Sequence, residues 1–384
     1  IYNKLNPKFE FIQDKNKSGL VSLSSKLLNE GTNELGATKF AEKLEENAIS
    51  LTTSNGFETF VIELSNLKEQ SSKGIELLTA LLKSPNYTQD TLNKLKTMQT
   101  GSLKRKENDF DYVANNQLKS VLFKGTTLEN SAAGTIESIS KIELKDIENF
   151  ISQTVCLENL IIVAGGDFEL KEFEKLVKPL LETLNVGKKA QLEEVNFISK
   201  KEEKVLIKDT QQAYIYFGSS FNINSKDEEN YKAKVASFIL GGSGFGSRLM
   251  EEIRVKRGLA YSAYGSISIN KSHSYFNGYL QTKNETADEA KKLVGEIIED
   301  FVKNGVTNDE LSAAKNFLTG SEPLRSETLS QRLNRAFTLY YRGLEPNYSQ
   351  KELEKIQNLE LTDLNNYIKS HNEINNLTFS IVRK

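Results

Sequence analysis

The chain has 384 residues, of which 38% are hydrophobic and 27% are charged, and its formal net charge is −2. This length is enough for two domains of ordinary size, and the near-neutral charge argues against a nucleic-acid or anionic-membrane partner, which would need a basic surface. No apolar run approaches the ~20 residues that span a bilayer. The single cysteine, Cys156, excludes an internal disulfide bond and precedes an apolar run, which predicts a buried small hydrophobe.

The first half of the chain predicts helices and strands in turn. Residues 18–29 space their leucines for one apolar helix face, and Gly31 is placed to end that helix. Residues 58–64 alternate as a strand does, with 50–53 as the partner strand. Further helices are predicted at 38–48, at 73–83, from 88 past 95 and at 142–154, and a buried strand at 160–164. Residues 1–17 are largely polar and irregular and predict no strand.

The second half repeats this order of elements. It predicts helices at 231–240 and 246–257, a strand pair at 259–268 and 275–281, a helix at 361–368 and a closing strand at 377–382. The sequence Thr286-x-x-Glu289 predicts a capping box that opens one more helix, and Thr307-x-x-Glu310 opens the next.

Short sequence matches keep a nearly constant register between the two halves. Residues 100–102 match 319–321, residues 122–125 match 340–343, and residues 142–146 match 359–363. We therefore predict an α+β fold made of two tandem homologous domains, residues 1–185 and 186–384. A linker is expected near 184–204, where charge and polarity rise.

The stretch from 241 to 264 is the most distinctive in the chain. Four glycines open it, namely Gly241, Gly242, Gly244 and Gly246. A short helix follows, with Arg254, Lys256 and Arg257 in its last turn and Gly258 as its stop. The side chain of Arg254 thus projects from a helix end, and that of Tyr261 projects from a strand three residues after the stop. A turn of this kind can bring a guanidinium and a phenol together on one wall.

Simpler interpretations exist for each of these residues. A cation in the last turn of a helix is favoured by the helix dipole, which would explain Arg254 together with its two basic neighbours. A tyrosine in a strand is most often a half-buried packing residue. The glycines follow a helix and lack the spacing and the lysine of a phosphate loop, so nucleotide binding is disfavoured and a flexible connection between helices is the plain alternative.

The same stretch resembles the second half of the insulinase-like (pitrilysin) zinc peptidases, in which a glycine-rich loop precedes R-L-x-x-E-I-R and R-G-L-A-Y-S. The resemblance implies two α+β repeats, each a largely antiparallel sheet covered by helices. It also implies that Arg254 and Tyr261 hold the substrate backbone near the zinc. In the non-catalytic subunit of the mitochondrial processing peptidase, the glycine-rich loop helps admit substrate, so the resemblance implies that role for Gly241, Gly242 and Gly244. The family opens with two strands, and residues 1–17 predict neither of them.

The zinc site of that family is an inverted H-x-x-E-H on the first helix of the catalytic half. Here the resemblance places Ser22, Ser25 and Lys26 where His, Glu and His belong, and none of the three can replace its counterpart. The helix at 92–103, where a further glutamate ligand would fall, has no acidic residue. The chain has only two histidines, His273 and His371, and each is expected to be an ordinary surface or core residue.

The sequence therefore predicts the zinc-less member of a two-subunit insulinase-like peptidase. The chain would have no catalytic or metal-binding residue of its own, and a zinc-bearing partner in a heterodimer would cleave unfolded peptides with Arg254 and Tyr261 supplied in trans. Two alternatives stay open: a purely structural subunit, as in the core proteins of the respiratory chain, and a homodimeric peptide-binding module. The compartment stays open as well, with a periplasmic or secreted location favoured over the cytoplasm.

Overall fold

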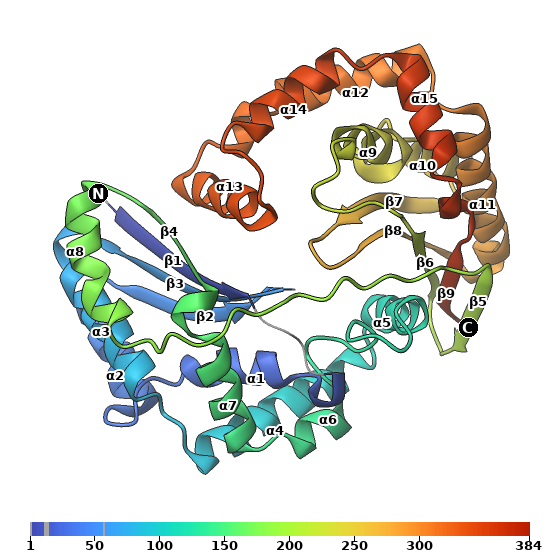
Figure 1. Cartoon of the computed structure of the whole chain (residues 1–384). Coiled ribbons are helices and arrows are strands. Elements are labelled where there is room, and N and C mark those ends of the chain that lie inside the picture. The colour runs from blue at the N-terminus through green and yellow to red at the C-terminus, as the bar shows by residue number, and fades with distance from the viewer. Residues whose placement is uncertain (1, 11–14, 57) are drawn as a thin grey trace. The chain divides into compact units, whose positions relative to one another are not determined.

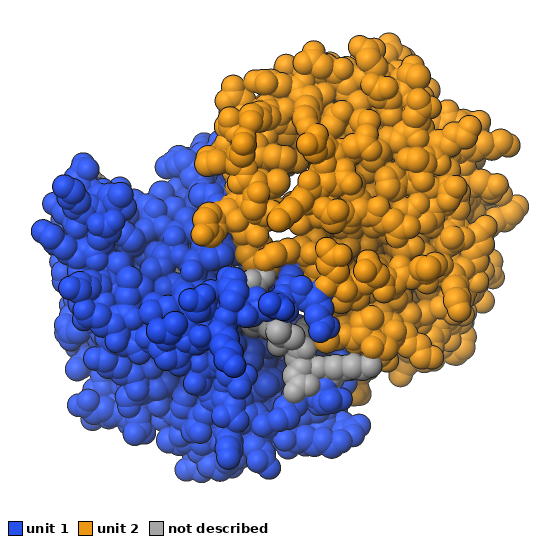
Figure 2. Space-filling view, in the orientation of Figure 1, with its two compact units in different colours: residues 1–105, 130–193, 326–337 blue, residues 106–129, 194–325, 338–384 orange. Residues whose placement is uncertain are grey.

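The computed structural model describes residues 2–10, 15–56 and 58–384, and these form two compact units (Figure 2). Unit 1 comprises residues 1–105, 130–193 and 326–337, and unit 2 comprises residues 106–129, 194–325 and 338–384. The main change from one unit to the other, between Glu193 and Glu194, falls inside the linker predicted near 184–204.

Unit 1 contains a four-stranded antiparallel sheet in the order β2-β3-β1-β4. Its strands are β1 (Tyr2–Glu10), β2 (Ser50–Asn55), β3 (Thr59–Leu67) and β4 (Leu160–Gly165). β1 corrects the expectation that residues 1–17 form no strand. The sequence does not indicate this strand, because a buried lysine, Lys8, breaks the apolar alternation. The strand also contains Pro7, and proline is rare in a central strand. The β1–β3 register has no paired residues at Asn6 and Pro7.

The core of unit 1 lies between this sheet and the helices that cover one of its faces (Figure 1). β3 sends Phe60, Ile62 and Leu64 into this core, where Phe60 meets Phe150 edge to face at 6.0 Å. The helices of the unit are α1 (Leu20–Leu28), α2 (Gly36–Glu46), α3 (Ser71–Lys83), α4 (Gln89–Lys106), α6 (Ile136–Lys141), α7 (Leu144–Thr154) and α8 (Leu170–Leu181).

Unit 2 contains a five-stranded sheet in the order β5-β9-β6-β8-β7. Its strands are β5 (Glu202–Ile207), β6 (Gln212–Ser220), β7 (Ala260–Ile269), β8 (Ser274–Lys283) and β9 (Thr378–Arg383). The order β7-β8-β6-β9 matches β2-β3-β1-β4 of unit 1, and the neighbours in both are antiparallel. β5 is an addition that pairs in parallel with β9. The two sheets confirm the predicted α+β fold of two homologous repeats.

The helices of unit 2 follow the same sequence of elements. They are α9 (Asn230–Ser237), α10 (Arg248–Met250), α11 (Ala287–Asn304), α12 (Asn308–Gly320), α14 (Tyr348–Gln357) and α15 (Leu361–Ser370). The capping box at Thr307 and Glu310 is formed. The one predicted at Thr286 is not, because its hydroxyl lies 2.7 Å from the Thr282 hydroxyl and caps no amide. Within the described residues, no helix is both long and apolar enough to cross a membrane.

Two helices belong to the unit formed mainly by the other half of the chain. α5 (Phe110–Leu122) lies in unit 2, on the face of the sheet opposite α9 and α11 (Figure 1), where Asp111 accepts a hydrogen bond from the Tyr216 hydroxyl at 3.2 Å. Most of α13 (Leu329–Arg342) lies in unit 1, where Ser330 accepts one from the β1 residue Lys4 at 3.0 Å. The units therefore differ from the ranges 1–185 and 186–384 by an exchange of these helices.

Candidate functional site

The glycine-rich loop connects α9 to α10 in unit 2 and is shaped by close backbone contact. Gly241 is buried, and a Cβ at this position would lie 2.4 Å from the backbone nitrogen of Gly265 in β7. Gly244 and Gly246 have φ angles of 68° and 92°, in the region that favours glycine. Ser247 caps α10 and also donates a hydrogen bond to the Gly244 carbonyl at 2.7 Å. The loop thus begins in a π-helical turn, Phe238–Gly242, and closes with a hydrogen-bonded turn at Gly244–Ser247.

We expect Gly241→Ala to lower the free energy of unfolding by about 1–3 kcal/mol, because a methyl group there must displace backbone atoms of β7. Gly295→Ala is the matched control: no atom lies within 4 Å of its Cβ position, and it lies inside α11. This control should raise stability by up to about 1 kcal/mol. Urea unfolding of both variants measures the difference, and equal stabilities would contradict the assignment of Gly241 to a packing contact.

The helical segment that carries Arg254 ends as the sequence predicts. α10 continues as a π-helical turn, Glu251–Val255, and Gly258 follows with a φ angle of 62°. The Gly258 amide donates to the Arg254 carbonyl at 3.0 Å, which satisfies one of the last carbonyls of the helix. The chain then enters β7, whose pairing with β8 is irregular between Ala260 and Ala263. Tyr261 lies in this irregular stretch.

Arg254 lies over two aromatic rings. The centre of its guanidinium is 4.3 Å from the centroid of the Tyr261 ring and 4.6 Å from that of Phe245. Both rings face solvent, with 81% of Tyr261 and 69% of Phe245 exposed. The structure therefore brings Arg254 and Tyr261 together on one wall, and the exposure of Tyr261 contradicts the simpler interpretation of a half-buried packing residue.

The neighbouring cations behave differently from Arg254. Lys256 and Arg257 both bind the Glu252 carboxylate at 2.6 Å, and hydrogen bonds from these two residues lower the pKa of Glu252. Among the described residues, no carboxylate lies within ion-pair distance of Arg254. Ion pairing with Glu252 thus accounts for the positions of Lys256 and Arg257 but not for that of Arg254.

The degenerate zinc-motif positions lie together on α1 in unit 1, and their polar atoms bond to the protein itself. The Ser25 hydroxyl is 3.0 Å from the Ser22 carbonyl and 3.3 Å from the Asn55 side-chain oxygen. Lys26 donates to the side chain of Gln99 on α4. Gln99 lies in the helix where the resemblance would place a glutamate ligand, and it donates in turn to the Ala133 carbonyl at 2.8 Å.

Both histidines have ordinary local partners. His371 lies 2.9 Å from Glu373 and stacks on Phe221. His273 is 6% exposed, and its ring nitrogens lie 2.9 Å from the Ser272 hydroxyl and 3.3 Å from the Asn270 amide. In the described part of the chain, no three residues of the His, Cys, Asp and Glu types come together as a metal site would require.

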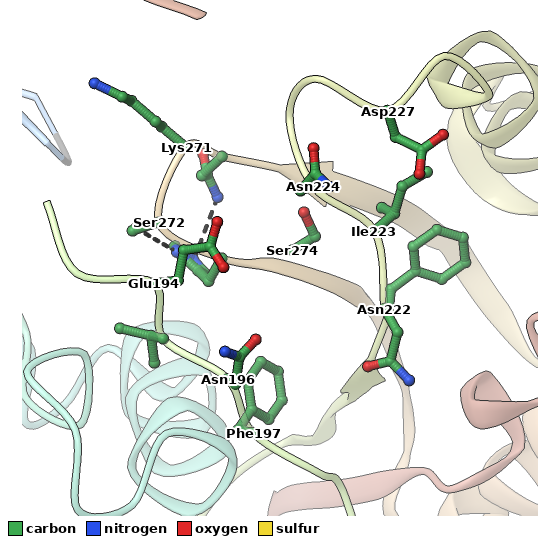
Figure 3. Close-up of a pocket in the computed structure, with 14 residues that line it drawn as sticks. Glu194, Asn196, Phe197, Asn222, Ile223, Asn224, Asp227, Lys271, Ser272 and Ser274 are labelled. Atoms are coloured by element: carbon green, nitrogen blue, oxygen red, sulfur yellow. Dashed lines mark hydrogen bonds between the residues drawn. The ribbon is translucent and has the colours of Figure 1, made fainter.

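A polar cavity of ≈ 370 Å³ lies beside His273 in unit 2 (Figure 3). Three segments line it: 194–197 of the linker, 221–227 after β6, and 270–274 at the turn between β7 and β8. The Ser274 hydroxyl faces this cavity and has no hydrogen-bond partner among the described residues. No short sequence pattern marks this cavity, because its three segments are far apart in the chain.

Two residues of these sites were missed at the sequence level. Phe245 stacks on Arg254, yet a lone phenylalanine between glycines indicates no function by itself. Gln99 lies in the helix noted for lacking an acidic residue, and its amide is a close isostere of the missing carboxylate. That isosteric relation was the one available signal.

Comparison with known proteins gives a consistent result. Residues 141–318 match the family described as the peptidase M16 inactive domain. The chain is 46% identical to "Non-peptidase homolog YmxG" of Helicobacter pylori over 97% of this chain and 86% of that protein.

Solved structures agree in fold. A peptidase M16 inactive domain from Pseudomonas fluorescens superposes with a TM-score of 0.93 at 22% identity, covering 100% of this chain and 92% of that one. A protease from Helicobacter pylori superposes with a TM-score of 0.87 at 17% identity, covering 100% and 94%. The chain therefore belongs to the insulinase-like peptidase M16 family, among its inactive members.

Proposed function

We propose that this chain is the non-catalytic subunit of a heterodimeric M16 peptidase and supplies Arg254 and Tyr261 to a zinc-bearing partner. The observation that carries the proposal is the half-buried Arg254, whose guanidinium lies over two exposed aromatic rings and has no acidic partner among the described residues. A guanidinium held in this way can donate hydrogen bonds to a peptide carbonyl or to the oxyanion that develops from it. The zinc, its ligands and the general base would come from the partner.

The degenerate first repeat supports the proposal that the partner supplies the zinc site and this chain supplies contacts to the substrate. The side chains of Ser25 and Lys26 bond to the protein itself, and an ammonium at the third position repels a dication. Peptide hydrolysis by this family needs a metal-activated water, which these side chains cannot hold. The second repeat keeps the residues that would contact substrate. An arrangement of this kind suits a subunit that contributes to an active site without containing one.

The proposal is tested by isolating the chain from its native cell with its bound partner. The isolated chain should contain no stoichiometric zinc by elemental analysis and should hydrolyse no peptide. The chain recombined with a zinc-bearing M16 partner should cleave unfolded peptides. Chelator-sensitive activity of the isolated chain, or full activity of every candidate partner without it, would refute the proposal. A purely structural subunit would assemble with its partner and leave peptide cleavage unaffected.

A homodimeric peptide-binding module is the second alternative that this experiment separates. Such a module would copurify only with itself and would bind an extended peptide without any partner. Size-exclusion chromatography with light scattering on the native complex distinguishes the two assemblies. Finding the chain only with copies of itself would favour this alternative.

A further inference from the structure

Phe245 is an apolar side chain that the fold keeps out of the core. Its ring is 69% exposed, whereas Leu249 and Met250, a few residues later, are fully buried. A single exposed apolar side chain is ordinary on a protein surface, so the significance of Phe245 depends on its neighbour. Here the neighbouring group is the Arg254 guanidinium, 4.6 Å from the ring centroid.

The backbone around Phe245 forms a closed turn that directs this residue out of the core. Gly244 and Gly246, which flank it, both have positive φ angles, so the loop turns sharply on each side of the phenylalanine. The Ser247 amide and hydroxyl bond to the Gly244 carbonyl at 3.1 and 2.7 Å and close the turn. The ring is therefore presented by a hydrogen-bonded turn and not by a loose loop.

Phe245 and Tyr261 together restrict what Arg254 can do. The contacts of the guanidinium with the two rings limit its orientation, and its N–H groups are the donors that can reach a ligand. Edge-on donation suits a carbonyl or carboxylate oxygen, and a fixed orientation reduces the entropy lost when the bond forms. An arginine without the second ring would sample many rotamers.

We infer that Phe245 is a positioning residue of the peptide-binding surface: it holds Arg254 so that the guanidinium edge meets the backbone carbonyl of an extended peptide. This inference rests on the proposed function for its substrate and on the two aromatic contacts for its geometry. Phe245 acts through Arg254 and makes no bond to the reacting atoms. The glycine-rich loop thereby gains a defined role, which is to present one aromatic ring.

The test uses Phe245→Leu, which keeps apolar bulk without a ring, and Phe245→Tyr, which keeps the ring. In the chain alone, the rate at which phenylglyoxal modifies Arg254 is followed by mass spectrometry, with Arg257 as the internal reference. Phe245→Leu should raise the Arg254 rate about two- to fivefold, the range expected for loss of an exposed cation–π contact. Phe245→Tyr should match the wild type, and the Arg257 rate should not change. Unchanged modification of Arg254 in Phe245→Leu overturns the inference.

A second measurement uses the recombined pair and a fluorescent, unstructured 20-residue peptide that the pair cleaves. Phe245→Leu should lower kcat/KM about two- to fivefold, and it should have no further effect once Arg254 is alanine, because both changes remove the same interaction. An additive loss in the double variant would assign Phe245 to loop folding and overturn the inference while the proposed function stands. Failure of the wild-type pair to cleave any peptide refutes the proposed function. The phenylglyoxal rates then still test, by themselves, whether Phe245 positions Arg254.

Discussion

Turnover of the recombined pair is expected to fall about 10²–10³-fold when Arg254 is replaced by alanine, because in the proposed function this change removes one oriented donor to the developing oxyanion. Arg254→Lys should also be poor, since an ammonium cannot reproduce the planar fork of donors or its contacts with the rings of Phe245 and Tyr261. Tyr261→Phe keeps the stacked ring and tests the phenol separately. The measurement is steady-state cleavage of an unfolded peptide, with assembly checked by size-exclusion chromatography.

Arg257→Ala is the matched control for this prediction. Arg257 leaves the same helix end, and its guanidinium is bound to Glu252 at 2.6 Å. Loss of this exposed pair should cost little stability and leave turnover unchanged. If Arg254→Ala and Arg257→Ala behave alike, Arg254 is one more helix-end cation. A complex that fails to assemble with Arg254→Ala would instead assign the residue to the interface between subunits.

The chain should lose stability on mild acidification because of His273. Burial, with a smaller effect from the nearby Lys119 ammonium, lowers the pKa of His273 from 6.5 to about 4. The unfolded chain therefore takes up a proton near pH 6.5, and the folded chain only near pH 4. Acid between these values favours the unfolded state, so the stabilisation is complete above pH 6.5 and falls as the pH drops. The loss should reach about 2 kcal/mol at pH 5 and about 3 kcal/mol at pH 4.

Urea unfolding at pH 7, 6 and 5 measures this effect in the wild type and in His273→Gln. The variant is expected to be less stable at pH 7, because Ser272 and Asn270 lose their ring partner, but its stability should change less between pH 7 and pH 5. His371→Gln keeps His273 and should retain the wild-type dependence on this group. Parallel pH profiles for the wild type and His273→Gln would show that His273 titrates alike in the folded and unfolded chains.

Features that depend on short stretches of sequence were predictable. The helix at α1 follows from its leucine spacing, and the stop at Gly258 follows from the need for a positive φ angle. The meeting of Arg254 and Tyr261 depends only on this stop and on the first residues of β7. Each of these features depends on a signal that spans no more than a dozen residues, so no distant contact was needed to predict it.

Features fixed by distant contacts were not predictable in the same way. β1 contains Pro7 and the buried Lys8, and it is a strand because β3 and β4, far along the chain, pair with it on both sides. No sequence pattern indicates that α5 and α13 are exchanged between the units either. The apolar side chains that α5 buries, such as Leu118 and Leu122, would be the same against either sheet. Phe245 was missed for a related reason, since its significance lies in a ring contact nine residues away.

The exchanged helices also bear on how the chain is made. Unit 1 includes residues 326–337, so the ribosome must translate nearly the whole chain before its sheet receives the last segment that belongs to it. At a synthesis rate of ~5–20 residues per second, that wait is on the order of ten seconds or more. During this time, the surface of β1 around Lys4 and Lys8 has no covering helix. The sheet of the first half therefore stays incomplete while the second half is made, and severing the chain in the linker would leave each half without a helix that completes its sheet.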